Sequence, residues 1–135
     1  MESNQVNRGQ GPETHRRPRI LIADNALSSR ELLHSILDSC GYEIVEVVDC
    51  FEVLECAIAF KPHLVILDLQ MPRLDGCRAA LLLRGHPTFE KIPMIALTAA
   101  VSDISADRIV AAGFTTHLVK PIGPDRLRRC VASLL

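Results

Sequence analysis

The sequence has no tryptophan, and it holds only four phenylalanines and one tyrosine among its 135 residues. Hydrophobic residues still make up 48% of the chain, so its apolar content is mainly aliphatic. Aliphatic runs of this kind are typical of β-strands that are buried on both faces of a sheet. A chain of this length is expected to form one domain with a real hydrophobic core.

An excess of charge of one sign is also missing, because the formal net charge is only −1. A chain so close to neutral has no overall field that attracts nucleic acid or an anionic membrane surface. No apolar run approaches the ~18 residues that a membrane-spanning helix needs, and the first residues contain no apolar signal segment. We therefore expect a cytoplasmic protein that binds neither nucleic acid nor membranes.

The five cysteines are odd in number and include no CxxC pair. Their spacing therefore indicates neither a disulfide framework nor a zinc site. We expect them to be reduced thiols, most of them buried, in a cytosolic protein.

The order of apolar patterns along the chain predicts the fold class. Residues 1–17 are polar and aperiodic, which predicts a disordered tail in front of one domain, residues 18–135. Within that domain, aliphatic runs alternate with segments of helical periodicity. The predicted strands are 20–23, 44–48, 64–67, 94–97 and 117–119; the predicted helices are 32–40, 53–58, 77–84, 104–112 and one that opens at 123–124. This alternation indicates an α/β fold with a parallel sheet covered on both faces.

Four polar residues, Asp24, Asp68, Thr98 and Lys120, come directly after predicted strands. Ligands of such sheets bind at the carboxyl ends of the strands, so these side chains are expected to converge. Two carboxylates at one place need a cation, and Asp24 and Asp68 with the amide of Asn25 would suit Mg²⁺. Lys120 and Thr98 add a positive charge and a hydroxyl. This set predicts phosphoryl transfer, with Asp68 as the attacking carboxylate.

The segments ILIADN, LVILDLQMPRLDG, MIALTA and HLVKP resemble the four signatures of the response regulator receiver domains of two-component signalling systems, the CheY-like family. The similarity covers Arg19 to Leu135. It implies a (βα)5 doubly wound, flavodoxin-like fold whose five parallel strands have the order 2-1-3-4-5. It also implies a signalling protein rather than a classical enzyme, one that assists its own phosphorylation and dephosphorylation. The implied partners are a histidine kinase or phosphotransfer protein and a downstream protein target, with the chain a monomer or weak dimer.

The resemblance assigns a role to each matching position. It makes Asp68 the phosphorylated residue, with Lys120 and Thr98 beside the phosphoryl group. It implies that Mg²⁺ is held by Asp24, Asn25, Asp68 and the carbonyl of Gln70.

Further matches concern the switch and the framework of the site. Thr98 matches the family's switch hydroxyl, and His117 stands at the position of its rotating aromatic ring. Pro72, Gly76 and Pro121 match structural positions, and the peptide bond before Pro121 is expected to be cis. Receiver domains contact partners through a surface that corresponds here to residues 104–135.

Asn25 departs from the family pattern, which usually has a second acid at that point. Since metal affinity follows ligand charge, Mg²⁺ is expected to bind more weakly here. The departure leaves open a phosphorylation-independent pseudo-receiver that acts as a binding module.

Two other classes use a similar fold or nucleophile. A phosphatase of the haloacid-dehalogenase type needs an acid at position 70, where this chain has Gln70. A flavodoxin-like cofactor binder needs a phosphate loop rich in Gly, Ser and Thr after the first strand, and residues 26–29 fit that poorly. We expect a stand-alone receiver with no output domain after the last predicted helix, whose output is protein–protein contact, unless the chain is a piece of a larger protein.

Overall fold

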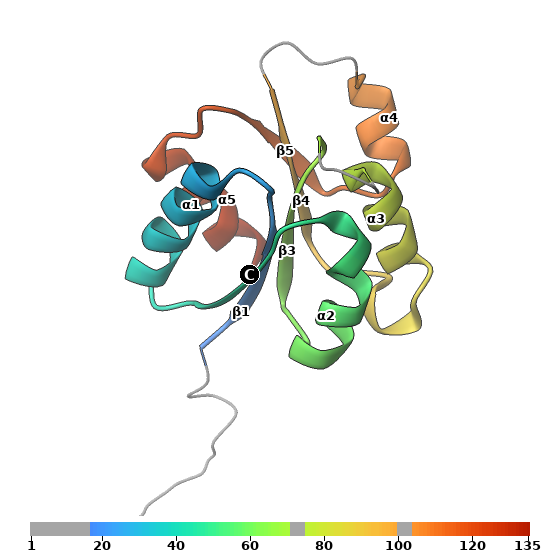
Figure 1. The fold of residues 1–135 in the computed structure, drawn as a ribbon, viewed down its shortest axis with the longest axis horizontal. Coiled ribbons are helices and arrows are strands. Elements are labelled where there is room, and N and C mark those ends of the chain that lie inside the picture. The colour runs from blue at the N-terminus through green and yellow to red at the C-terminus, as the bar shows by residue number, and fades with distance from the viewer. Residues whose placement is uncertain (1–16, 71–74, 100–103) are drawn as a thin grey trace, which may run out of the picture.

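A computed structural model describes residues 17–70, 75–99 and 104–135. One parallel sheet runs through the molecule in the order β2-β1-β3-β4-β5 (Figure 1). This is the order that the resemblance to receiver domains implies, and the fold class is confirmed. The strands are β1 (Arg19–Ala23), β2 (Glu43–Val47), β3 (Leu64–Asp68), β4 (Met94–Thr98) and β5 (Thr116–Val119).

Helices cover both faces of the sheet, as Figure 1 shows, with α1 and α5 on one side and α2, α3 and α4 on the other. The helices are α1 (Leu27–Ser39), α2 (Val53–Phe60), α3 (Gly76–Arg84), α4 (Ala106–Ala111) and α5 (Pro124–Leu134), with short 3₁₀ turns η2 (Cys50–Glu52) and η3 (Pro87–Phe89). Helices α1 to α4 each connect two parallel strands, and α5 follows the last strand, so the carboxyl ends of all the strands meet at one edge of the sheet.

Two hydrophobic clusters lie on the two faces of the sheet because successive strand residues point to opposite sides. In β1, Leu21 and Ala23 belong to the cluster under α2 and α3, whereas Ile20 and Ile22 belong to the cluster under α1 and α5. All five residues of β3 are buried. The central strands β3 and β4 are therefore buried along their whole length, and the polar residues at their carboxyl ends stand on a rigid base.

Several predicted boundaries are wrong by a few residues. Helix α1 begins at Leu27, earlier than its apolar stripe indicates. Helix α4 begins at Ala106 and not at residue 104, because the Ser105 side chain accepts a hydrogen bond from the Arg108 N–H and caps the helix. The strand before Lys120 gains Thr116. Such shifts are small, and no element changes its type.

The cysteines are free thiols, as expected, but fewer are buried than the sequence indicates. Only Cys50 and Cys77 are buried, and Cys40 is exposed because it follows the last turn of α1.

The expected tail falls almost wholly on residues 1–16, which lie outside the described residues. Across the described ranges, no helix combines the length and the apolar character that crossing a bilayer requires.

Candidate functional site

The carboxyl ends of four strands bring the predicted residues to one edge of the sheet. Asp24 follows β1, Asp68 ends β3, Thr98 ends β4 and Lys120 follows β5. The strand pairing sets their order, since Asp68 is in register with Leu97 of β4, next to Thr98. The two acids are almost inaccessible to solvent, with Asp24 0% and Asp68 6% exposed.

Lys120 joins the two acids directly. Its Nζ atom lies 3.0 Å from Oδ2 of Asp24 and 3.0 Å from Oδ2 of Asp68. Burial alone would lower the pKa of Lys120, but its hydrogen bonds to Asp24 and Asp68 raise that pKa above its ordinary value. The lysine is therefore a firmly charged ammonium that neutralises part of the negative charge at this edge.

The two carboxyl groups differ in how they are held. Burial disfavours the Asp24 anion, but hydrogen bonds from Ser29, the Ala26 N–H and Lys120 lower the pKa of Asp24 below its usual value. Burial raises the pKa of Asp68, and neighbouring Asp24 adds to that rise. Asp68 also has fewer of these hydrogen bonds, from the Gln70 N–H (3.0 Å) and Lys120.

The main chain of Asp68 is packed against two small residues. A Cβ atom at Gly76 would stand 2.5 Å from the Asp68 carbonyl oxygen and 2.9 Å from Cα of Leu69. The Cys50 thiol lies 3.9 Å from the same carbonyl oxygen. Burial and the nearby charge of Asp68 raise the pKa of Cys50 to about 12, so Cys50 stays a neutral thiol. Neither neighbour competes with Asp68 as a nucleophile.

Thr98 and Lys120 are connected through the backbone. Thr98 is buried, its carbonyl accepts a 2.8 Å hydrogen bond from the Lys120 N–H, and its Oγ1 lies 3.4 Å from the Ala99 carbonyl oxygen. The Lys120–Pro121 peptide bond is cis, as the sequence predicts. The ends of β4 and β5 are thus held together beside Asp68.

The other residues that the sequence predicts lie outside this cluster of charged side chains. Asn25, Gln70 and His117 are exposed, and His117 lies on β5 in register with Ala96. Pro72 lies outside the described residues. The structure brings Asp24, Asp68 and Lys120 into direct contact, and within the described part of the chain Asn25 and His117 do not belong to that cluster.

The donors at this edge fit a hard divalent cation. The two buried carboxylates of Asp24 and Asp68 are oxygen ligands of the kind that Mg²⁺ prefers. Among the described residues, no group of three His, Cys, Asp or Glu side chains has the arrangement of a metal site. A magnesium ion here would therefore depend on neutral oxygens in addition to the two acids.

Sequence reasoning missed the contribution of the first turn of α1. The Ser29 hydroxyl donates to Asp24 Oδ2, and Nη1 of Arg30 donates to the Asp24 carbonyl oxygen at 2.8 Å. The Arg30 guanidinium also lies 3.3 Å from Glu46 of β2. The only signal for these contacts is the position of both residues one helical turn after a strand-end acid.

A groove of about 420 Å³ adjoins the site between α1 and the segment that follows β5. Lys120 lines one end of it, and the rest is largely apolar, formed by residues that include Leu32, Leu33, Ile36, Pro121 and Ile122. Leu32 is about half exposed there. The groove offers an apolar docking surface next to a charged site.

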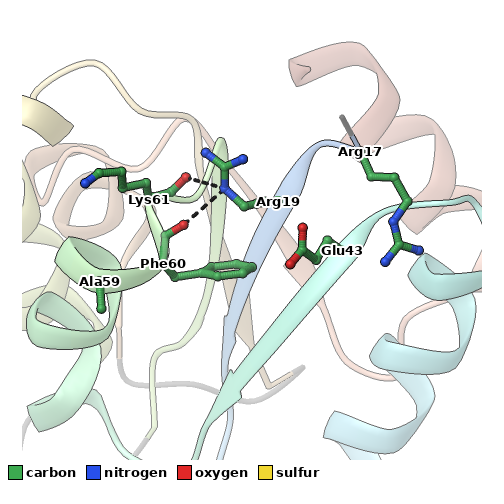
Figure 2. Close-up of a pocket in the computed structure, with 6 residues that line it drawn as sticks. All are labelled: Arg17, Arg19, Glu43, Ala59, Phe60 and Lys61. Atoms are coloured by element: carbon green, nitrogen blue, oxygen red, sulfur yellow. Dashed lines mark hydrogen bonds between the residues drawn. The ribbon is translucent and has the colours of Figure 1, made fainter. Parts of the chain in front are cut away.

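A second hollow lies at the opposite, amino-terminal edge of the strands (Figure 2). Figure 2 shows the Arg19 guanidinium beside the end of α2, where its Nε donates to the carbonyl oxygens of Phe60 and Lys61. Glu43 lines the same hollow and places a negative charge within it. Arg19 thereby satisfies carbonyls at the helix end, and this hollow is remote from the strand ends that carry Asp24 and Asp68.

Comparison with known proteins agrees with this arrangement. The family profile described as the response regulator receiver domain matches residues 20–132. The chain is 28% identical over 116 residues to the polar-differentiation response regulator DivK of Brucella anthropi, covering 86% of this chain and 94% of DivK. Among solved structures, the chemotaxis protein CheY4 of Vibrio cholerae has a TM-score of 0.84 at 27% identity, covering 89% of this chain and 100% of CheY4.

A longer relative matches as well. The probable transcriptional regulator ycf27 of Cyanophora paradoxa is 39% identical over 119 residues, which cover 87% of this chain and 48% of ycf27. The chain thus spans about half the length of that relative. The family profile covers most of the chain, and the strand order and the acids at the strand ends are those that the resemblance implies. The chain therefore belongs to the response regulator receiver domain family.

Proposed function

We propose that Asp68 accepts a phosphoryl group from a phosphorylated histidine of a kinase or phosphotransfer protein, and that the chain then signals through protein contacts. The observation that carries this proposal is the contact of Lys120 with both buried acids at the strand ends. Receiver domains are signalling modules of two-component systems, so the chain is proposed as a phosphoacceptor and not as a classical enzyme.

The chemistry follows from the charges at this edge. An oxygen of the Asp68 carboxylate attacks phosphorus, an acyl phosphate bond forms, and the bond from phosphorus to the histidine nitrogen breaks. The electron pair stays on that nitrogen, and the departing imidazole, protonated at its other nitrogen, leaves as a neutral ring. Negative charge spreads over the phosphoryl oxygens during this transfer. Lys120, 3.0 Å from Asp68, is placed to stabilise that charge.

A magnesium ion would be held by the carboxylates of Asp24 and Asp68, the amide oxygen of Asn25 and the carbonyl of Gln70. Bound there, it would neutralise charge on the phosphoryl oxygens. Asn25 and Gln70 contribute no charge of their own, so the chain's own ammonium, Lys120, carries a larger share of the neutralisation than in a site with a third acid.

Two surfaces are proposed for partners. The apolar groove beside Lys120 suits a phosphodonor, because a protein that docks there sets its histidine next to the site. The downstream target is proposed to bind residues 104–135, where Val110 and Val119 are exposed. His117 lies on the same strand as Val119, and we propose that it reorients when Thr98 moves toward the phosphoryl group.

The test is intact mass after exposure of the full chain to acetyl phosphate, with and without Mg²⁺. One added phosphoryl group is expected in the parent and none in Asp68→Asn. Asp107→Asn, an exposed acid on α4, is the matched control and should be labelled like the parent. Labelling of Asp68→Asn would show that the assignment of the phosphoacceptor is wrong.

A second candidate is the phosphorylation-independent pseudo-receiver. Asn25 in place of an acid favours it, because Lys120 already neutralises one of the two remaining acids without a metal. In that case the same surfaces bind partners, and the parent gains no phosphoryl mass at any concentration of Mg²⁺.

A further inference from the structure

The carboxylate of Asp24 is surrounded by donors from its own chain. Its Oδ1 accepts a hydrogen bond from the Ala26 N–H at 2.9 Å. Its Oδ2 accepts from the Ser29 hydroxyl at 2.5 Å and from Lys120 Nζ at 3.0 Å. The side chain is wholly buried, so water does not compete for these positions.

Ser29 and Lys120 share one oxygen atom, and this sharing connects Ser29 to the nucleophile. Lys120 Nζ lies at the same distance, 3.0 Å, from Oδ2 of Asp68. The lysine therefore stands between two acids that compete for it. A hydroxyl that already stabilises Asp24 weakens the pull of Asp24 on the ammonium group and leaves Lys120 within reach of Asp68.

The hydroxyl of Ser29 does not serve its own helix. The residue before α1 is Ala26, which provides no side-chain cap, and Ser29 lies inside the first turn. A serine there would ordinarily bond to backbone groups of the turn or to solvent. Here it reaches back five residues to the acid at the end of β1, and Arg30 beside it binds the Asp24 carbonyl oxygen. Residues of α1 thus hold both the carboxylate and the main-chain carbonyl of Asp24.

We propose that Ser29 is a positioning residue of the phosphorylation site, which acts through Asp24 to hold Lys120 beside Asp68. The residue after Asp24 is Asn25, so Asp24 alone supplies the acid after β1, and its orientation determines where the ammonium group sits. The proposal rests on the proposed function, since the consequence of a misplaced Lys120 is slower phosphoryl transfer to Asp68.

The first experiment measures phosphorylation by acetyl phosphate at saturating Mg²⁺ in the full chain. A small donor is used because Ser29 also lines the apolar groove where a protein donor would dock. Loss of a hydrogen bond to a charged group predicts an initial rate about tenfold lower in Ser29→Ala. Ser29→Thr keeps the hydroxyl and is expected to restore the rate to within about threefold of the parent. Ser28→Ala, at the exposed neighbouring serine, should match the parent.

The second experiment monitors the environment of the Lys120 ammonium group in the absence of any phosphoryl donor. The ¹⁵N–¹H signal of the Lys120 ammonium group is recorded in the parent and the same three variants, with no metal added. A shift of this signal is expected in Ser29→Ala, with recovery in Ser29→Thr and no change in Ser28→Ala. Because this readout needs no phosphorylation, it decides the inference even if the parent takes no phosphoryl group, which would count against the proposed function alone.

An unchanged Lys120 signal in Ser29→Ala, together with a parental rate, would overturn the proposal. An equal loss of rate in Ser29→Ala and Ser29→Thr with Lys120 signals unmoved would assign the effect to packing of α1, and it would overturn the proposal as well. Urea unfolding of each variant identifies any general loss of stability.

Discussion

Gly76 lies so close to the main chain of Asp68 that a Cβ atom at position 76 would stand 2.5 Å from the Asp68 carbonyl oxygen. The contact is backbone against backbone, so no flexible side chain is available to move aside. The Gly76 N–H also donates to the Leu69 carbonyl oxygen at 3.3 Å, which holds the start of α3 against the end of β3. The absence of a side chain at position 76 is therefore a condition for the geometry of the main chain at Asp68.

Gly76→Ala is expected to destabilise the chain by about 2–3 kcal/mol, the upper part of the usual range for overpacking, because the contact is with rigid backbone. It should also displace Asp68 and slow its phosphorylation. Gly85→Ala is the matched control, because it lies at the other end of α3 in a right-handed helical conformation with its nearest atoms at ordinary contact distance, 3.5 Å. In urea, the free energy of unfolding of Gly85→Ala should equal that of the parent or slightly exceed it. Equal free energies of unfolding for Gly76→Ala and Gly85→Ala would contradict a close contact between position 76 and the Asp68 main chain.

The guanidinium of Arg84 ties α3 to two other segments. Its Nε and Nη2 donate to the Gly113 carbonyl oxygen at 3.0 and 2.7 Å, and Nη1 donates to the Phe89 carbonyl oxygen at 3.0 Å. Arg84→Lys keeps the charge but loses the planar fork, so we expect a loss of about 2 kcal/mol in the free energy of unfolding. Arg78→Lys, exposed on the same helix, should stay within about 0.5 kcal/mol of the parent. If both substitutions changed the free energy of unfolding in urea by a similar amount, the hydrogen bonds of Arg84 to Gly113 and Phe89 would not explain the loss.

The sequence was sufficient to predict the elements and the convergence of the site. Aliphatic runs ending on Asp24, Asp68, Thr98 and Lys120 have one plausible arrangement, a parallel sheet whose carboxyl edge carries them all. The order of the strands came from the resemblance to receiver domains, since periodicity alone fixes the type of an element and not its neighbour.

Side-chain partners that depend on the rotation of a helix could not be predicted. The reach of Ser29 back to Asp24 and the fork of Arg84 on Gly113 both depend on how helices are turned against strands. Boundaries failed where capping decides them, as at Ser105, whose hydroxyl starts α4 two residues later than the apolar pattern indicates. The structure shows where the site residues lie, but the roles assigned to them stay predictions, for Asp24, Asp68, Thr98 and Lys120 as much as for Asn25, Gln70 and His117.

We expect His63 to make the stability of the amino-terminal edge depend on pH. Its Nδ1 accepts a hydrogen bond from the Arg19 N–H at 2.9 Å, which requires that nitrogen to be unprotonated. His63 is exposed, but partial desolvation of its ring, with the charge of Arg19, lowers its pKa below the ordinary value of 6.5. In the unfolded chain the ring gains its proton at higher pH than in the folded chain. The contribution of His63 is therefore complete above about pH 6.5 and is lost as the pH falls below it toward the folded-state pKa.

The comparison uses His63→Asn, whose amide oxygen can accept the same hydrogen bond without titrating. The free energy of unfolding of the parent relative to this variant should fall between pH 7.5 and pH 5 and level off below the folded-state pKa. A difference that stays constant across this range would show that the hydrogen bond does not control the titration of His63.

The last prediction concerns the negative charge that the site lacks because residue 25 is an asparagine and not an acid. Asp24 and Asp68 carry two negative charges and Lys120 one positive charge, so the empty site has a single net negative charge. Asn25→Asp adds a second at an exposed position where it needs no new packing. We expect this variant to bind Mg²⁺ about tenfold more tightly, measured by titration of the metal-free protein. Ser28→Asp adds the same charge to the exposed first turn of α1 and should change the affinity far less.

The added charge has an opposite effect after phosphorylation. In the phosphorylated parent, the two negative charges of the phosphoryl group and the one of Asp24 are balanced by Lys120 and Mg²⁺, so the site is neutral. In Asn25→Asp, the site keeps one net negative charge beside the phosphoryl oxygens. Weaker Mg²⁺ binding before phosphorylation is thus compatible with phosphorylation of Asp68. The parent should accept a phosphoryl group at millimolar Mg²⁺, but more slowly than Asn25→Asp. If the parent gains no phosphoryl mass at saturating Mg²⁺ while Asn25→Asp does, Asn25 abolishes the reaction. The natural chain would then be a pseudo-receiver whose partner surfaces work without phosphorylation.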